Sequence, residues 1–189
     1  MKINRKFILA SQSPRRKELL EMIGLDFTID PSDFDEHDNT GSPQSTAIHN
    51  AEGKAKEVAQ RHPDALILGV DTVVYCRDRI LGKPKDEADA RRILNLLSGS
   101  THEVISALCL IDSKTGATET ATSTTEVTID QLTPQQIEDY IACGEGADKA
   151  AGYAIQGLGA LFVREIKGDY FNVVGLPLYS LNKMLESSR

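Results

Sequence analysis

The chain has 189 residues, of which 40% are hydrophobic and 26% are charged, and its formal net charge is −7. These values are ordinary for a globular protein and exclude a disordered chain, a collagen repeat and a coiled coil. The negative charge also argues against a protein that wraps nucleic acid, because such proteins carry a basic face.

The three cysteines are far apart and form no CxxC or Cys/His spacing, so they predict neither a zinc site nor a disulfide framework. The apolar stretch before Ser11 is too short for a secretory signal. No run approaches the roughly 18 apolar residues that span a bilayer. We therefore expect a cytoplasmic protein with reduced cysteines and no membrane partner.

Strand and helix patterns alternate in the first half of the chain. Residues 6–10 predict a short buried strand, and Ser13-Pro14 then begins a helix that ends at Gly24. There follow a strand over residues 26–29, a loop over 31–43, a helix over 45–61, a buried strand over 66–74, a turn at 77–78 and a strand at 80–81. This alternation favours an α/β sheet.

The second half adds hairpins. Asp86 caps a helix that ends near residues 98–99, and two long β segments over 102–112 and 118–128 are joined by a turn at 114–116. We then expect a helix from Thr133-Pro134 to Gly144, a strand over 160–165, a turn at 167–169 and a last helix from 176. The hairpins make the predicted sheet mixed, with flanking helices, in one domain over residues 1–189.

The start of the first predicted helix is a candidate anion site. Residues 11–16 read Ser-Gln-Ser-Pro-Arg-Arg, which places two arginines in the first helical turn. Positive side chains are unfavourable there because the helix dipole already puts positive charge at that end. A bound phosphate would reverse this, since arginine forks match phosphate oxygens. The alternative is an exposed helix start with solvent-facing arginines.

Asp71 is a second candidate, because it puts a carboxylate inside the apolar run 66–74. A buried carboxylate costs several kcal/mol unless it is paired. It could serve as a metal ligand or a general base, or it could pair structurally with a lysine or arginine. Lys83, between Gly82 and Pro84, would suit a phosphate as a point charge, although this tripeptide is common in turns.

Several nucleotide-binding patterns are missing. The chain has no GxxxxGK[ST] motif, and its glycine-rich stretch at 152–159 follows a helix and precedes a strand, the reverse of a dinucleotide fingerprint. The acidic segment 33–38 lacks the glycine and glutamate of an EF-hand, so we expect a solvated loop.

Together these segments resemble the Maf family. Residues 11–20 are similar to its N-terminal signature, SxSPRRxxLL. The similarity continues in the family's order through Asp35-Glu36, Ala51-Glu52-Gly53-Lys54-Ala55, Asp71-Thr72-Val73-Val74, Gly82-Lys83-Pro84, Leu97-Ser98-Gly99, His102, Asp148-Lys149-Ala150, Gly152-Tyr153-Ala154-Ile155-Gln156-Gly157 and Val174-Gly175-Leu176-Pro177.

The resemblance implies a fold like that of inosine triphosphate pyrophosphatases, with two lobes around a deep cleft. It implies hydrolysis of a nucleoside triphosphate to the monophosphate and pyrophosphate with a divalent metal cation, Mg or Mn, and a possible homodimer. Asp71 would be the proton acceptor, and Glu36 with Asp71 would contact the metal. Five residues would line the triphosphate site: Ser11, Arg15, Arg16, Lys54 and Lys83.

Within the family, threonine after the catalytic aspartate marks the branch that acts on dTTP and UTP, and glutamine there marks the 7-methyl-GTP branch. This chain has Thr72, so the resemblance implies that Arg15, Thr72 and Gln156 select a pyrimidine base. Two departures are Gln12, where glycine is usual, and residues 104–107, where a threonine-glycine pair is common. The rival hypotheses are a 7-methyl-GTP pyrophosphatase and a nucleotide-binding regulator of septum formation without turnover.

Overall fold

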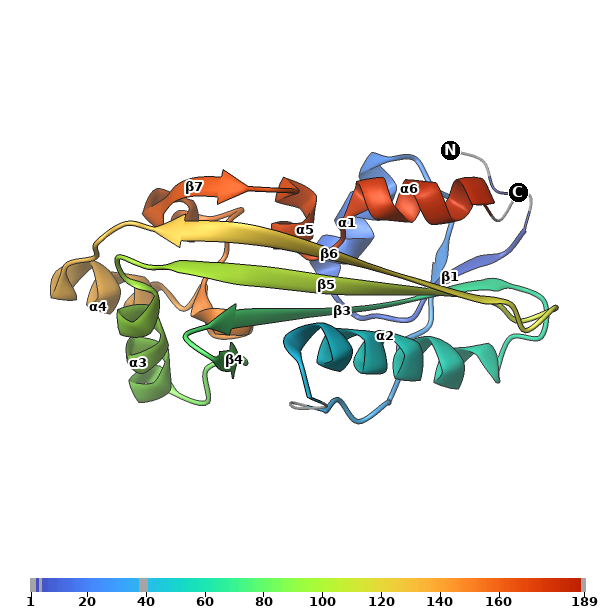
Figure 1. The fold of residues 1–189 in the computed structure, drawn as a ribbon, viewed down its shortest axis with the longest axis horizontal. Coiled ribbons are helices and arrows are strands. Elements are labelled where there is room, and N and C mark those ends of the chain that lie inside the picture. Colours follow the sequence, from blue (N-terminus) through green and yellow to red (C-terminus); the bar gives the residue numbers. More distant parts are fainter. Residues whose placement is uncertain (1–2, 4, 38–40, 188–189) are drawn as a thin grey trace. The chain divides into compact units, whose positions relative to one another are not determined.

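The computed structural model describes residues 3, 5–37 and 41–187. Asp38, the last residue of the acidic segment, lies outside the described residues. Among the described residues, seven strands form one mixed sheet in the order β2-β1-β3-β5-β6-β7, with β4 paired to β3 (Figure 1). The strands are β1 (Phe7–Leu9), β2 (Thr28–Ile29), β3 (Leu66–Cys76), β4 (Arg79–Leu81), β5 (Thr101–Asp112), β6 (Thr118–Ile129) and β7 (Val163–Lys167). Strand β1 is parallel to β2 and β3, whereas β4 and β7 are antiparallel to their neighbours, which confirms the mixed sheet.

Helices flank this sheet. They are α1 (Pro14–Met22), α2 (Pro43–Ala59), α3 (Glu87–Leu97), α4 (Pro134–Cys143), α5 (Tyr170–Val174) and α6 (Leu178–Ser187), with two short 3₁₀ helices, η1 (Ala150–Gly152) and η2 (Leu158–Phe162). Within the described ranges no helix is both long enough and apolar enough to cross a membrane.

The chain divides into two compact units. The first unit comprises Met1–Asp71, Ser106–Ser123 and Gly175–Arg189, and the second comprises Thr72–Ile105 and Thr124–Val174. The division therefore falls within β3, β5 and β6, at Asp71–Thr72 in the case of β3.

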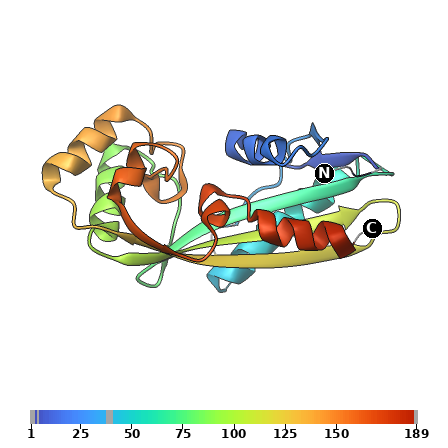
Figure 2. The same cartoon turned by 90° about the horizontal axis from the view of Figure 1, so that it is seen from above.

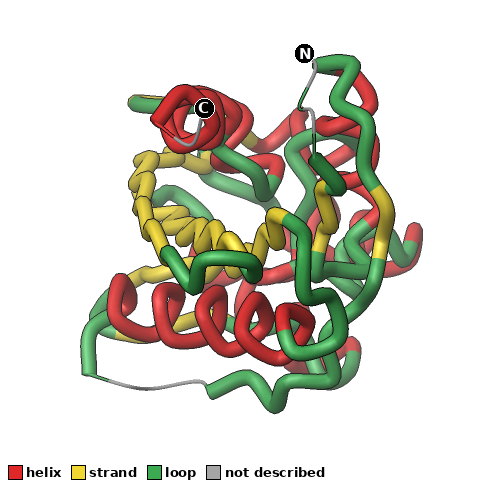
Figure 3. The backbone as a smooth tube through the Cα atoms, turned by 90° about the vertical axis from the view of Figure 1, so that its right-hand side faces the viewer, coloured by secondary structure: helices red, strands yellow, loops and turns green. Residues whose placement is uncertain are grey.

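In the first unit, α2 and α6 cover opposite faces of the sheet (Figures 1 and 3). Its fully buried side chains include Ile8, Leu20, Ile67, Leu68 and Leu108. Helix α2 lies close to β3 because Gly69 has no side chain. A Cβ there would lie 2.1 Å from the carbonyl oxygen of Ala51 and 2.8 Å from Cβ of Ala55. Any larger residue would force α2 away from the strand.

In the second unit, α3 and α4 lie side by side (Figure 2). They enclose a separate apolar core with η1, η2 and the ends of the long strands; its members include Val74, Leu94, Leu97, Val127, Ile137, Tyr140, Ala151 and Phe162. Each unit thus has its own buried core.

The predicted local signals are mostly confirmed. Asp86 caps α3 by accepting a hydrogen bond from the Asp89 amide at 2.8 Å, and Thr133 forms a capping box with Gln136 on α4. Gly144 ends α4 in the left-handed conformation, at φ 74°. Arg77 and Asp78 form the predicted turn, both at positive φ.

Some predicted boundaries were wrong. Helix α2 begins two residues early, because Ser42 is its N-cap and Ser45 is the N3 partner of a capping box. Strand β7 begins at Val163, since residues 158–162 form η2. Strand β2 is shorter than predicted, and α5, which has only five residues, was not predicted.

Candidate active site

Strand β3 and helix α2 bring Asp71 and Lys54 together in the first unit. Asp71 is 5% exposed and Lys54 is 7% exposed. The Lys54 ammonium lies 2.7 Å from Oδ1 of Asp71 and 2.6 Å from Oε1 of Glu36, and it donates to the Val70 carbonyl at 3.4 Å. One buried ammonium therefore joins two carboxylates, which supplies the pairing that the buried Asp71 requires.

The loop that carries Glu36 is fixed against α2. Gly53 makes room for Phe34, since a Cβ on Gly53 would lie 2.3 Å from the phenyl ring. Asn50 holds the next turn: its Oδ1 accepts from the His37 amide at 2.9 Å, and its Nδ2 donates to the His37 carbonyl at 3.0 Å. Glu36 itself remains half exposed, with 58% of its side chain accessible.

Asn50 also contacts the aspartate. Asn50 is 3% exposed, and its Nδ2 donates to Oδ2 of Asp71 at 3.2 Å. Sequence reasoning missed this residue. The available signal was an amide one helical turn before Lys54, because residues four apart lie on the same face of a helix.

Arg16 and Ser11 form a second part of the site. The Arg16 guanidinium donates to Oγ of Ser11 at 2.9 Å and to the Gly175 carbonyl at 3.0 Å. Burial lowers the pKa of Arg16, while the carboxylates of Asp71 and Glu36 act in the opposite direction. The half-buried guanidinium thus lies within electrostatic range of both carboxylates.

Arg15 differs from Arg16. It is half-buried, and in the described part of the chain its side chain has no hydrogen-bond or ion-pair partner. The Ser13 side chain does not cap α1, and the first turn of that helix holds no acidic residue. The Arg15 guanidinium and the start of α1 are therefore able to bind an anion.

The remaining predicted substrate contacts belong to the second unit. Thr72 follows Asp71 in β3 and is half-buried. Lys83 is exposed between β4 and α3, where the Gly82 carbonyl accepts from the Ala151 amide at 2.9 Å. Gln156 is exposed between η1 and η2. Within the described ranges neither Lys83 nor Gln156 has a side-chain partner.

The residues predicted to contact a metal are a pair of carboxylates. Among the described residues, no three His, Cys, Asp or Glu side chains form a metal-binding group. Asp71 and Glu36 nevertheless converge on one cation, the Lys54 ammonium. Two carboxylate oxygens suit Mg or Mn, which take further ligands from substrate phosphates and water.

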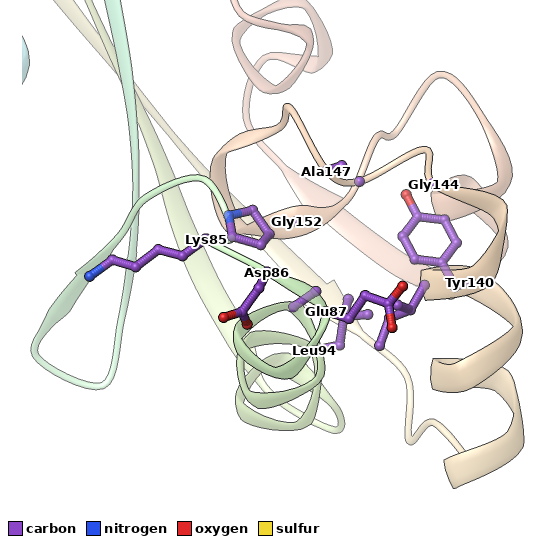
Figure 4. A pocket seen from close by; sticks show the side chains of 12 residues that line it. Lys85, Asp86, Glu87, Leu94, Tyr140, Gly144, Ala147 and Gly152 are labelled. Atoms are coloured by element: carbon purple, nitrogen blue, oxygen red, sulfur yellow. The ribbon is translucent and has the colours of Figure 1, made fainter.

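A pocket of about 300 Å³ lies in the second unit, between the start of α3 and the end of α4 (Figure 4). Its wall includes Leu94, Tyr140 and Ile141, with Asp86 and Glu87 beside them. None of the predicted site residues lines it.

Comparison with known proteins defines first the fold and then the family. The solved structure of the Staphylococcus aureus Ham1 protein covers 98% of this chain and all of its own length, with a TM-score of 0.55 at 14% identity, so the two share a fold. The sequence matches the family described as Maf-like protein over residues 6–188. The chain belongs to the Maf family.

Its relatives are similar over nearly their whole length. A dTTP/UTP pyrophosphatase of Moorella thermoacetica is 49% identical over 95% of this chain and 93% of its own. Proteins with the same name from Ruminiclostridium cellulolyticum and Bacillus cytotoxicus are 48% and 47% identical, each covering 96% of this chain and 95% of its own.

Proposed function

We propose that this chain hydrolyses dTTP and UTP to the nucleoside monophosphate and pyrophosphate. The observation that carries the proposal is the cluster of Asp71, Lys54 and Glu36 in the unit that also holds the arginine-bearing start of α1. The relatives named dTTP/UTP pyrophosphatase support the same reaction.

In this proposal cationic side chains bind the triphosphate, and Asp71 is the proton acceptor. Arg15, Arg16, Lys54 and Lys83 bind phosphate oxygens, and the Ser11 hydroxyl donates to one of them. Asp71 accepts a proton from a water whose oxygen attacks the α-phosphorus. The bond from this phosphorus to the bridging oxygen breaks, and pyrophosphate leaves.

A divalent cation fits this arrangement. Asp71 and Glu36 would hold Mg or Mn, which would stabilise negative charge on the phosphates as a Lewis acid. The Lys54 ammonium is paired with the same two carboxylates. We propose that Lys54 turns to the phosphates when substrate binds.

The base is read by Thr72 and Gln156 of the second unit, with Arg15. A carboxamide offers one donor and one acceptor, which match the N3–H and O4 of uracil or thymine. We further propose that the chain acts as a single Maf domain in a cytoplasmic homodimer. Light scattering of the purified protein measures that oligomeric state.

The first test is pyrophosphate release from dTTP, UTP, CTP, dATP, GTP and 7-methyl-GTP with magnesium or manganese. Asp71→Asn is run beside the wild type, with Asp64→Asn as the matched control because Asp64 is an exposed, ion-paired aspartate of the same unit. We expect hydrolysis of dTTP and UTP that Asp71→Asn abolishes and Asp64→Asn leaves unchanged. Folded wild-type protein that binds nucleotides without turnover would support the regulator hypothesis instead, and preference for 7-methyl-GTP would support the other branch.

A further inference from the structure

The loop that presents Gln156 is tied to the end of α4 by one carboxylate. Oε2 of Glu145 accepts a hydrogen bond from the Leu158 amide at 2.8 Å, and its Oε1 accepts from the Gly159 amide at 3.0 Å. Gln156 lies two residues before this pair of amides. Glu145 therefore fixes the chain where it leaves the Gln156 turn.

A tyrosine fixes the chain where it enters the turn. The Tyr140 hydroxyl accepts from the Ala154 amide at 3.0 Å and donates to Oε1 of Glu145 at 2.7 Å. The next anchor is Tyr153, whose hydroxyl lies 2.8 Å from Nε2 of the buried His102. Three backbone amides of this short loop and the buried side chain of Tyr153 are thus hydrogen-bonded to side chains outside it.

The packing around the carboxylate is close. A Cβ on Gly157 would lie 2.0 Å from Oε2 of Glu145, and one on Gly159 would lie 2.6 Å from the Ala154 carbonyl oxygen. The Gly157 amide also donates to the Ala154 carbonyl at 3.3 Å, which closes the turn. The loop therefore packs closely on Glu145: a side chain at position 157 would displace the carboxylate, and one at position 159 would clash with the backbone of Ala154.

Glu145 holds the loop as an ionised group. Burial alone would raise the pKa of its carboxyl, but the hydrogen bonds from Gly159, Tyr140 and Leu158 outweigh this and lower the pKa below its usual value. Burial and the neighbouring Glu145 raise the pKa of the Tyr140 phenol, so Tyr140 remains a donor. The charge-assisted bonds are stronger than neutral ones.

We propose that Glu145 and Tyr140 are positioning residues for base selection: they fix the turn that presents the Gln156 carboxamide, and so determine the preference for UTP over CTP without contacting substrate. The proposal rests on the function proposed above, in which Gln156 reads the base. Uracil and cytosine reverse the donor and acceptor at adjacent ring positions. A carboxamide distinguishes them only when its backbone holds oxygen and nitrogen in place.

The experiment compares Glu145→Gln and Tyr140→Phe with Glu165→Gln, an exposed glutamate of the same unit on β7. We expect Glu145→Gln to lower kcat/KM for UTP by about 10-fold or more, mainly through KM, because small misplacements of a binding group are costly. For CTP, kcat/KM should change by less than about 3-fold, so the ratio of kcat/KM for UTP to kcat/KM for CTP falls. Tyr140→Phe should shift the ratio in the same direction and Glu165→Gln should leave it unchanged.

The Gln156→Ala variant separates a positioning role of Glu145 from a role in fold stability alone. Gln156→Ala removes the carboxamide, so adding Glu145→Gln to it should change the UTP to CTP ratio by less than about 2-fold, as expected for residues that act through one another. Circular dichroism verifies that each variant is folded. Equal losses for UTP and CTP in folded Glu145→Gln, or a full effect in the Gln156→Ala background, would overturn the proposal.

Calorimetric binding of UTP and CTP to Asp71→Asn protein distinguishes the two proposals. A wild type that does not hydrolyse nucleotides, combined with a UTP preference in binding that Glu145→Gln removes, would refute the proposed reaction and retain the positioning role. Absence of a UTP preference in binding would refute the positioning role.

Discussion

Replacing Lys54 by methionine tests whether the ammonium is what permits Asp71 to be buried. Methionine keeps a flexible apolar chain of similar length and removes the charge. In the variant the Asp71 carboxylate, whose side chain is 7% exposed, would keep the hydrogen bond from Asn50 at 3.2 Å but lose the cation at 2.7 Å. Removing one partner of a buried pair costs about 3–5 kcal/mol. The half-exposed Glu36 adds about 0–1 kcal/mol, because solvent screens its pairing.

The assay is urea unfolding followed by circular dichroism without nucleotide. With a slope of about 2–3 kcal/mol per molar urea, a loss of about 4 kcal/mol lowers the midpoint by about 1.5 M. The double variant Lys54→Met/Asp71→Asn has no buried charge at these two positions, so it should lie within about 2 kcal/mol of the wild type. Lys56→Met on the same helix is the control, since its ion pair with Glu52 is exposed and contributes about 0.5 kcal/mol or less.

Two results would refute this reasoning. One is a midpoint for Lys54→Met within about 0.3 M of the wild type, which would mean that the pair contributes less than about 1 kcal/mol. The other is a double variant whose loss equals the sum of the two single losses, because coupled partners must show non-additive effects.

Three further predictions concern other parts of the structure. Burial lowers the pKa of His102 from its ordinary value of 6.5 to about 4, so neutral His102 stabilises the fold above pH 6.5 and this contribution falls as the pH drops below 6.5. The free energy of unfolding should therefore fall by about 2 kcal/mol between pH 7 and pH 5 because of His102. In His102→Gln this part of the pH dependence should disappear. A free energy of unfolding that depends on pH as in the wild type would contradict the assignment. Asn50→Leu removes the amide beside Asp71 and should lower kcat by about 10–100-fold with KM for UTP little changed; wild-type turnover in steady-state kinetics would show that Asn50 is dispensable. Gly69→Ala places a methyl group 2.1 Å from the Ala51 carbonyl oxygen, so it should destabilise the fold by about 1–3 kcal/mol and also lower activity. Urea unfolding measures the stability and pyrophosphate release measures the activity. Unchanged stability and activity would mean that α2 can move away from β3 at no cost.

The sequence predicted those parts of the fold that depend on neighbours along the chain. The caps at Asp86 and Thr133, the turn at 77–78 and the long hairpin follow from short-range signals, and all are present. The start of α2 was misjudged because both Ser42 and Ser45 suit an N-cap, and only the reciprocal capping box decides between them. Helix α5 spans one turn and carries no usable periodicity.

The site was harder to predict, because its geometry depends on contacts distant in sequence. The buried carboxylate of Asp71 indicated where the candidate site is centred, since an apolar strand seldom carries one. The pairing of Lys54 with both carboxylates could not be predicted, because it requires the close approach of α2 to Gly69. Asn50 and Glu145 were missed for the same reason: their partners lie 21 residues away in one case and 13 and 14 in the other.

The boundary between the two compact units has a consequence for how such enzymes can diverge. It falls at the peptide bond between Asp71 and Thr72, inside β3. Gain or loss of one residue within a paired strand turns every following side chain to the other face of the sheet. Insertions and deletions are therefore disfavoured between Asp71, the proposed proton acceptor, and Thr72, which is proposed to select the base. Under the proposed role of Thr72, a lineage would change its base preference by substitution at position 72, while the length of the strand stays constant.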